Sequence, residues 1–125
     1  MWGRSVVKED RERERRIQME IVVDCYGEIE HAIGWHCYLD DQLKFPFRAR
    51  CVALRVISPL TKGEEIEVLK MAPEGECEKE MFVIVRWKGR RLGVPLGQLE
   101  SIDVDHGTDQ AIRDWHYWMK RGYEF

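Results

Sequence analysis

The sequence lacks the features of a membrane-embedded or exported protein. None of its apolar runs approaches the ~20 residues that a membrane-spanning helix needs, and its first residues carry mixed charges without the apolar segment of a signal peptide. We therefore expect a cytoplasmic protein that does not bind membranes. Its 125 residues are typical of one domain, so we expect a single domain over residues 1–125.

Cysteine is scarce, and its spacing does not indicate a metal site. No two cysteines form a CxxC pair, and neither His36 nor His116 lies at a zinc-finger spacing from one. In a chain without an export signal we expect reduced, mostly buried thiols rather than disulfides or zinc ligands. The four cysteines are Cys25, Cys37, Cys51 and Cys77.

The sequence also has little excess charge. Its 20 basic and 23 acidic residues give a net charge of −3, which argues against a general nucleic-acid binder. The rings of Trp115, Tyr117 and Trp118 could stack on bases, but no basic stripe accompanies them. We expect them instead to belong to a helix that packs against the rest of the fold.

No catalytic motif is present. The sequence contains no GxSxG, HExxH, P-loop or Rossmann glycine pattern. Cys77 lies among glutamates, whose negative charge raises the pKa of a thiol and makes it a poor nucleophile. An enzyme that uses His36 or His116 is a weaker alternative, and we predict a protein without enzymatic activity.

Hydrophobic periodicity divides the chain into zones. Residues 1–16 form a charged leader with a solvated face, and residues 17–43 have helical spacing. Residues 45–104 contain short β-rich runs, with a tight turn at Gly89, and residues 108–121 form a C-terminal helix. We predict an α+β fold, with a small SH3-like β-barrel flanked by N-terminal helices and the C-terminal helix. The predicted strands include residues 48–57, 66–71, 81–87 and 92–96.

The same spacing predicts the buried side chains, and Gly27 is expected to end the first helix. The first helical face consists of Ile17, Ile21, Val22 and Cys25. The second consists of Ile29, Ala32, Ile33, His36 and either Leu39 or Asp40. The C-terminal face consists of Ile112, Trp115, His116 and Met119. The predicted barrel core consists of Ile66, Val68, Val83, Val85, Trp87 and Leu99.

Acidic segments are the main signal for a ligand. The string PEGECEKEM (73–81) places a glutamate at every second position, and alternate residues of an extended segment point to one side. Converging carboxylates repel unless a lysine, a basic partner or a metal ion lies among them. The four are Glu74, Glu76, Glu78 and Glu80, of which Glu80 could instead pair with an arginine.

Two further acidic segments could supply oxygen ligands. Asp40 and Asp41 end a predicted helix, where carboxylates oppose the negative end of the helix dipole and a bound cation would relieve this. The string DVDHGTD (103–109) begins like an EF-hand loop, but Gly107 is one position early and Asp114 replaces the last glutamate. Each segment could equally be an ordinary solvated surface.

Several long strings resemble one small bacterial family. They are YLDDQLKFPF (38–47), ARC (49–51), EVLKMAPEGECEKEMFVIVRW (67–87), GVPLGQLE (93–100) and DWHYWMKRGYEF (114–125). Through them, residues 19–125 resemble the cyanobacterial-type calcium-binding proteins, which bind calcium without EF-hands. The resemblance implies reversible calcium binding in the cytosol, as a buffer or a sensor in calcium signalling.

Oxygen chemistry, and not the resemblance, selects the residues that we expect to bind calcium. Ca²⁺ accepts about six to eight oxygen ligands in a flexible geometry, whereas Mg²⁺ demands a compact octahedron and should compete poorly. Without a preformed loop, we expect an affinity on the order of micromolar or weaker. The alternative function is an SH3-like interaction module whose acidic face docks a basic partner protein. The predicted metal ligands are Asp40, Asp41, Glu74, Glu76, Glu78 and Glu80.

Overall fold

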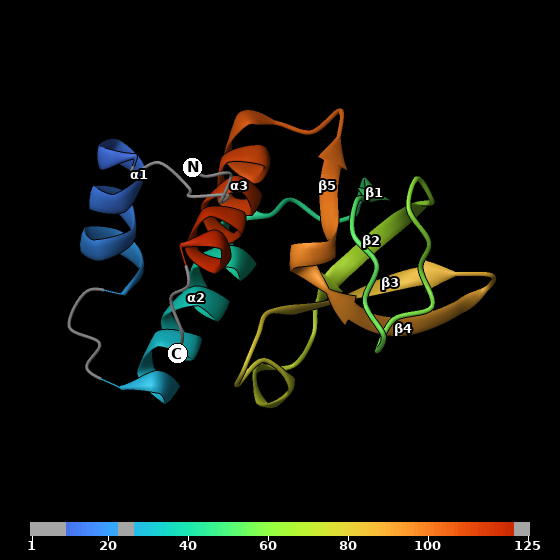
Figure 1. The fold of residues 1–125 in the computed structure, drawn as a ribbon, viewed down its shortest axis with the longest axis horizontal. Helices are drawn as coiled ribbons and strands as arrows, with labels where there is room; N and C mark the ends of the chain where they lie inside the picture. Colours follow the sequence, from blue (N-terminus) through green and yellow to red (C-terminus); the bar gives the residue numbers. More distant parts are fainter. Residues whose placement is uncertain (1–9, 23–26, 122–125) are drawn as a thin grey trace, which may run out of the picture.

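The computed structural model describes residues 10–22 and 27–121. Within these residues, three α-helices gather at one end of the molecule and a five-stranded sheet forms the other end (Figure 1). The predicted α+β class is confirmed. No helix in this part of the chain is both long enough and apolar enough to cross a membrane.

The described part of the charged leader is a folded element. Helix α1 (Arg11–Arg16) begins after Asp10, whose side chain accepts a hydrogen bond from the backbone N–H of Arg13 at 3.0 Å. A π-helical turn (Ile17–Ile21) follows directly, and both of its terminal isoleucines are buried, as their spacing predicts. The predicted burial of Cys25 concerns a residue outside the described ranges.

Helix α2 (Glu28–Gln42) buries only part of the predicted face: Ala32 and Leu39 are buried as predicted, but the two isoleucines are not. Gly27 does not end a helix but stands at the N-cap of α2. Ile29 is 66% exposed and Ile33 39% exposed, whereas Trp35 is fully buried. The large indole of Trp35 decides the face, because it packs against two tryptophans of the C-terminal helix. The buried residues are Ala32, Trp35 and Leu39.

The five strands form an antiparallel sheet in the order β4-β3-β2-β1-β5. The strands are β1 (Phe47–Cys51), β2 (Glu65–Met71), β3 (Phe82–Trp87), β4 (Arg90–Pro95) and β5 (Leu99–Ile102). The predicted first strand is too long, because residues 52–57 leave the sheet after β1. The β3–β4 turn is tight, as predicted, with Lys88 and Gly89 both at positive φ (50° and 75°).

A closed SH3-like barrel is not confirmed. Strands β4 and β5 stand at opposite edges of the sheet, and the described residues show no ladder between them. Strand β5, of four residues, pairs with β1, so the sheet of the described residues stays open between β5 and β4. A 3-10 turn (Leu96–Gln98) connects these two strands.

Helix α3 (His106–Lys120) packs against α2 and seals the core. Trp115, Tyr117 and Trp118 are buried, so the packing role predicted for them is confirmed and a stacking platform for bases is not available. Met119, predicted to face the core, is 37% exposed. The predicted sheet core is buried except for Trp87, which is half-buried.

Candidate metal-binding carboxylates

The acidic connection between β2 and β3 is not an extended segment. Residues Glu74–Glu76 form a 3-10 turn, so the alternation that would place four carboxylates on one side does not apply. Glu74, Glu76 and Glu78 are all exposed. The described part of the chain gives none of the three an ion-pair partner, so their charges face solvent.

Cys77 anchors this connection to the core. It is 1% exposed, and its sulfur accepts a hydrogen bond from the backbone N–H of Phe82 at 3.4 Å. Burial raises the pKa of the Cys77 thiol, and the charges of Glu76 and Glu74 raise it further. The inward orientation and the poor nucleophilicity predicted from the sequence are both consistent with this environment.

Glu80 differs from the other glutamates because it is already paired. Its two carboxylate oxygens accept hydrogen bonds from the Arg55 guanidinium at 2.7 and 2.8 Å, a bidentate geometry. The Glu80 side chain is only 12% exposed. The hydrogen bond from Arg55 to Glu80 raises the pKa of that arginine. Of the two roles considered for Glu80, the structure therefore favours the arginine pair.

Asp40 and Asp41 occupy the last turn of α2, and both are exposed. No basic residue lies in this turn, so nothing in it offsets the negative end of the helix dipole. Asp41 lines an open groove of about 500 Å³ together with Glu20 and Tyr38. The Gln42 amide donates a hydrogen bond to the Asp41 carboxylate at 3.3 Å. Both carboxylates are thus accessible to a cation from solvent.

The segment 103–109 begins helix α3 and does not form an EF-hand loop. Asp105 caps the helix, because its carboxylate accepts hydrogen bonds from the backbone N–H and the hydroxyl of Thr108, at 3.1 and 2.6 Å. These bonds lower the pKa of the Asp105 carboxyl. Asp109 accepts a hydrogen bond from Arg113 at 2.7 Å. Asp105 and Asp109 are therefore used in the fold itself.

The three acidic segments do not converge on one point. Within residues 10–22 and 27–121, no group of three or more His, Cys, Asp or Glu side chains is placed to hold a metal ion. Helix α2 does approach the acidic connection, where His36 Nε2 lies 2.8 Å from the carbonyl oxygen of Ala72. The six predicted ligands thus form separate groups, and their role in metal binding stays a prediction.

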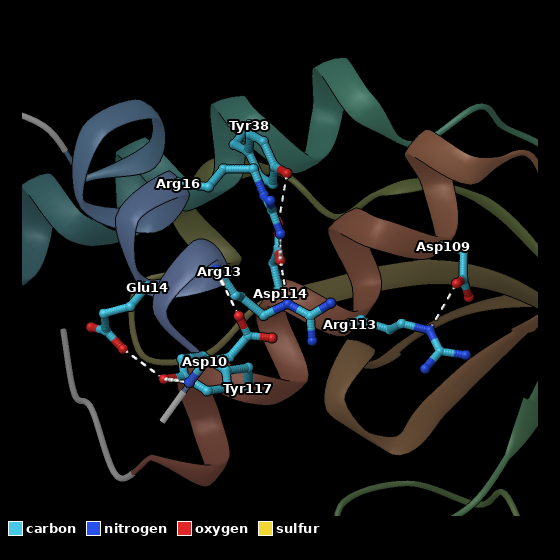
Figure 2. Close-up of polar contacts among 9 residues, drawn as sticks. All are labelled: Asp10, Arg13, Glu14, Arg16, Tyr38, Asp109, Arg113, Asp114 and Tyr117. Carbon is cyan, nitrogen blue, oxygen red and sulfur yellow. Dashed lines mark hydrogen bonds and ion pairs between the residues drawn. The ribbon is translucent and has the colours of Figure 1, made fainter. Parts of the chain in front are cut away.

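The most highly coordinated carboxylate belongs to a residue that was not predicted as functional. Asp114 of α3 is fully buried, and Figure 2 shows it facing Arg13 and Arg16 of α1 and Tyr38 of α2. Arg16 donates to it through Nη2 at 2.6 Å and Nε at 3.0 Å, and the Tyr38 hydroxyl donates at 2.8 Å. The Nε atom of Arg13 forms an ion pair with it at 2.9 Å.

These contacts make Asp114 a structural carboxylate. Its hydrogen bond raises the pKa of Arg16. Burial raises the pKa of Tyr38, and the bond to Asp114 raises it further. Both oxygens of Asp114 already receive donors, so the residue ties three helices together and offers no free ligand to a metal. The charged leader is therefore not simply solvated, because Arg13 and Arg16 turn inward.

A second contact joins α1 to α3 beside Asp114. The backbone N–H of Asp10 donates to the Tyr117 hydroxyl at 3.1 Å, and that hydroxyl donates to Glu14 at 2.8 Å (Figure 2). One sequence signal could have identified Asp114: it lies three residues after Ala111 and four residues before Trp118, inside an apolar helical stripe. A carboxylate in such a stripe requires a buried partner.

Two solved structures of other proteins are similar to this chain in sequence and in fold. The crystal structure of Anabaena CcbP is 42% identical and superposes with a TM-score of 0.86, covering 98% of this chain and 100% of that chain. A calcium binding protein in its calcium-binding form is also 42% identical, with a TM-score of 0.83 over 93% of this chain and 95% of that one. The comparison with curated proteins gives no match.

The strongest assignment comes from the family model. A family described by calcium binding matches residues 15–119, which is most of the chain and includes the acidic connection, both aspartates of α2 and Asp114. This family is one of calcium-binding proteins and not one of enzymes. The chain belongs to the CcbP family of calcium-binding proteins.

Proposed function

We propose that this protein binds Ca²⁺ reversibly through exposed carboxylates and without an EF-hand. The family match over residues 15–119 and the similarity to a protein solved in its calcium-binding form support the choice of ion. The ligands that we propose come from the acidic connection and from the last turn of α2. A cytoplasmic location and a role as buffer or sensor are further predictions.

The observation that carries the proposal is the unpaired state of three neighbouring glutamates. Glu74, Glu76 and Glu78 have no ion-pair partner in the described part of the chain. Two unit charges ~4 Å apart repel by roughly 1 kcal/mol in bulk water, and a divalent cation would replace this repulsion with attraction. By contrast, acids on the sheet are paired with arginines. These are Glu65, Glu67 and Glu100.

Asp40 and Asp41 provide the second proposed group of ligands. They are exposed at the negative end of a helix that has no basic residue in its last turn. Ca²⁺ tolerates irregular geometry and completes its coordination with backbone carbonyls and water, so two or three carboxylates per ion are sufficient. Because the two groups do not converge, we propose that they bind separate ions.

Calorimetric titration of the full chain with CaCl₂ and MgCl₂ tests this proposal. The first variant is Glu74→Gln/Glu76→Gln/Glu78→Gln, and the second is Asp40→Asn/Asp41→Asn. The matched control, Glu12→Gln/Glu30→Gln/Glu100→Gln, removes the same charge from α1, α2 and β5. We expect each of these two variants to lose the ion held by its own group of carboxylates, so that fewer calcium ions bind per chain, while the control keeps the wild-type stoichiometry.

The possible results test calcium binding and the assignment of its ligands separately. If the wild-type protein gives no saturable heat with calcium, calcium binding itself is wrong, and the alternative of an acidic face that docks a basic partner gains support. If the first variant binds calcium as tightly as the control, the protein binds calcium elsewhere. Relief of repulsion should also make the metal-free first variant slightly more stable than the wild-type protein.

A further inference from the structure

A group of basic residues lies at the end of the molecule opposite the helices. The β3–β4 hairpin carries the string RWKGRR (86–91), and its turn is the part of the sheet farthest from α1, α2 and α3 (Figure 1). Four of these residues are basic and exposed. They form what we name the basic edge: Arg86, Lys88, Arg90 and Arg91.

Strand register shows that the charge pattern of the sheet is incomplete at this edge. Arg48 of β1 stands opposite Glu67 of β2, and Glu67 stands opposite Arg86 of β3. Arg86 then stands opposite Arg91 of β4, so the alternation of charges ends in two adjacent arginines. Like charges at directly opposite positions are destabilising. A negative charge on the far side of β4 would restore the alternation.

The nearby acids are already engaged within the sheet. Glu67 pairs with Arg86 at 3.2 Å, and Glu65 is shared by two arginines of β1. Arg90 and Arg91 have no ion-pair partner among the residues that the structure describes. The basic edge thus presents unneutralised positive charge on a protein whose net charge is −3.

Strand β4 is also an open edge of the sheet. Among the residues that the structure describes, it pairs with β3 alone, so alternate backbone N–H and C=O groups face away from the sheet. Gly93 in the middle of the strand is exposed and has no side chain to block the approach of another backbone. The arginines would repel β4 of a second copy, but they would attract an acidic strand.

We propose that the basic edge binds an acidic, extended segment of a partner protein, which adds to the sheet as a strand beside β4. Charge complementarity at Arg90 and Arg91 provides selectivity, and the free backbone groups of β4 provide hydrogen bonds. A nucleic acid would use only the charge, and the net negative charge of the protein opposes it. The proposal goes beyond calcium binding and uses none of the proposed calcium ligands.

Binding of a synthetic peptide to the full chain, in calcium-free buffer, tests the proposal. The probe is a capped peptide in which Glu alternates with Thr, and its matched control has Gln in place of Glu. We expect the Glu peptide to bind and the Gln peptide to bind at least about tenfold more weakly, with the difference decreasing as salt is added. Fluorescence anisotropy of a labelled peptide measures both affinities.

Charge-reversal variants of the protein then locate the site, and a modified peptide tests whether binding forms a β-ladder. Arg90→Glu/Arg91→Glu should weaken binding by at least about tenfold. Arg11→Glu/Arg15→Glu makes the same charge change on exposed positions of α1 and should have less than about a twofold effect. A Glu peptide that is N-methylated at alternate residues keeps its charge but cannot complete a β-ladder, and it should not bind.

Four results would overturn the proposal. They are no binding of the Glu peptide, equal losses in the two charge-reversal variants, full binding of the N-methylated peptide, or tighter binding of a single-stranded oligonucleotide than of the peptide. The last result would assign the basic edge to nucleic acid. A circular dichroism spectrum like that of the wild-type protein shows that each variant is folded before its affinity is measured.

Discussion

Two groups of carboxylates in this protein have opposite environments. Asp114 is fully buried, and two arginines and a tyrosine from other helices reach its oxygens. Glu74, Glu76 and Glu78 lie on an exposed turn with no ion-pair partner in the described part of the chain. A buried charge must be compensated by the protein, whereas an exposed one leaves its compensation to solvent or to a bound cation.

The comparison separates carboxylates that hold the fold together from those that can bind a ligand. Asp114 joins α1, α2 and α3, and its loss should affect stability but not calcium affinity. Loss of the exposed glutamates should lower calcium affinity without lowering stability. Two residues, Glu80 and Asp105, lie between these extremes: Glu80 is partly accessible and Asp105 is exposed, but each is already bonded within the protein.

The largest expected effect is that of Asp114→Asn. The substitution leaves Arg13 and Arg16 facing a neutral amide, and breaking a buried ion pair by removing one partner is strongly destabilising. Because both arginines are partly exposed, we expect a loss of about 3 kcal/mol in the free energy of unfolding, at the lower end of that range. Urea denaturation measures it, and Asp40→Asn is the exposed control.

A loss below about 1 kcal/mol for Asp114→Asn would mean that the three-helix contact contributes little. The comparison predicts a second property of this variant. Its calcium affinity, measured wherever it is folded, should equal that of the wild-type protein. A weakened calcium affinity would place Asp114 in the binding site after all.

Calcium should stabilise the protein by nearly as much as Asp114→Asn is expected to destabilise it. An ion that binds only the folded state raises the free energy of unfolding by roughly 2.7 kcal/mol at a hundredfold excess over its dissociation constant. We expect this rise with CaCl₂ and little change with MgCl₂, as measured by thermal denaturation. The shift should be reduced in Glu74→Gln/Glu76→Gln/Glu78→Gln, which loses one of the two proposed ions, and kept in Asp114→Asn. Equal shifts with both salts would indicate general charge screening.

Glu80→Gln should have a smaller effect on stability. The bidentate pair with Arg55 is partly exposed, since the arginine side chain is 36% accessible. We therefore expect a loss of about 1 kcal/mol and an unchanged calcium affinity. A marked loss of calcium affinity, with little loss of stability, would return Glu80 to the set of metal ligands. Chemical denaturation and calorimetry on the same variant distinguish these results.

The smallest effect concerns acid denaturation through Asp105. Hydrogen bonds from Thr108 lower its pKa below the ordinary value of 3.8. The unfolded chain therefore binds this proton more readily, so the contribution of Asp105 is present above about pH 4 and is lost as pH falls through the lowered pKa. Asp105→Asn should make the free energy of unfolding, measured by urea denaturation, depend less on pH in this range. An unchanged profile between about pH 2 and 4 would contradict the capping role.

Local sequence patterns predicted much of the sheet. The alternating run at 66–71 matches β2 (Glu65–Met71), and the apolar run at 81–87 matches β3 (Phe82–Trp87). These predictions succeed because strand alternation and turn chemistry act over a few residues. The buried face of α2 is predicted only in part: Ala32 and Leu39 are buried as predicted, but contacts with α3 select Trp35 in place of Ile33.

The alternating glutamates of PEGECEKEM were interpreted as one converging set. The inference required an extended segment, but the chain turns at Glu74–Glu76 and buries Cys77. Arg55, which is 25 residues from Glu80 in the sequence, forms an ion pair with that glutamate and not with its neighbours. Neither the turn nor the distant arginine follows from the spacing of the glutamates.

The sequence by itself determined the α+β class, the main strands, the inward Cys77 and the family to which the chain belongs. Each of these depends on local periodicity or on long shared strings. Only the tertiary structure decided which carboxylates have a positive partner. Asp114 and Arg16, for example, are 98 residues apart in the sequence but are hydrogen-bonded to each other in the fold. Electrostatic partners depend on distances between elements, and only the packed fold fixes those distances.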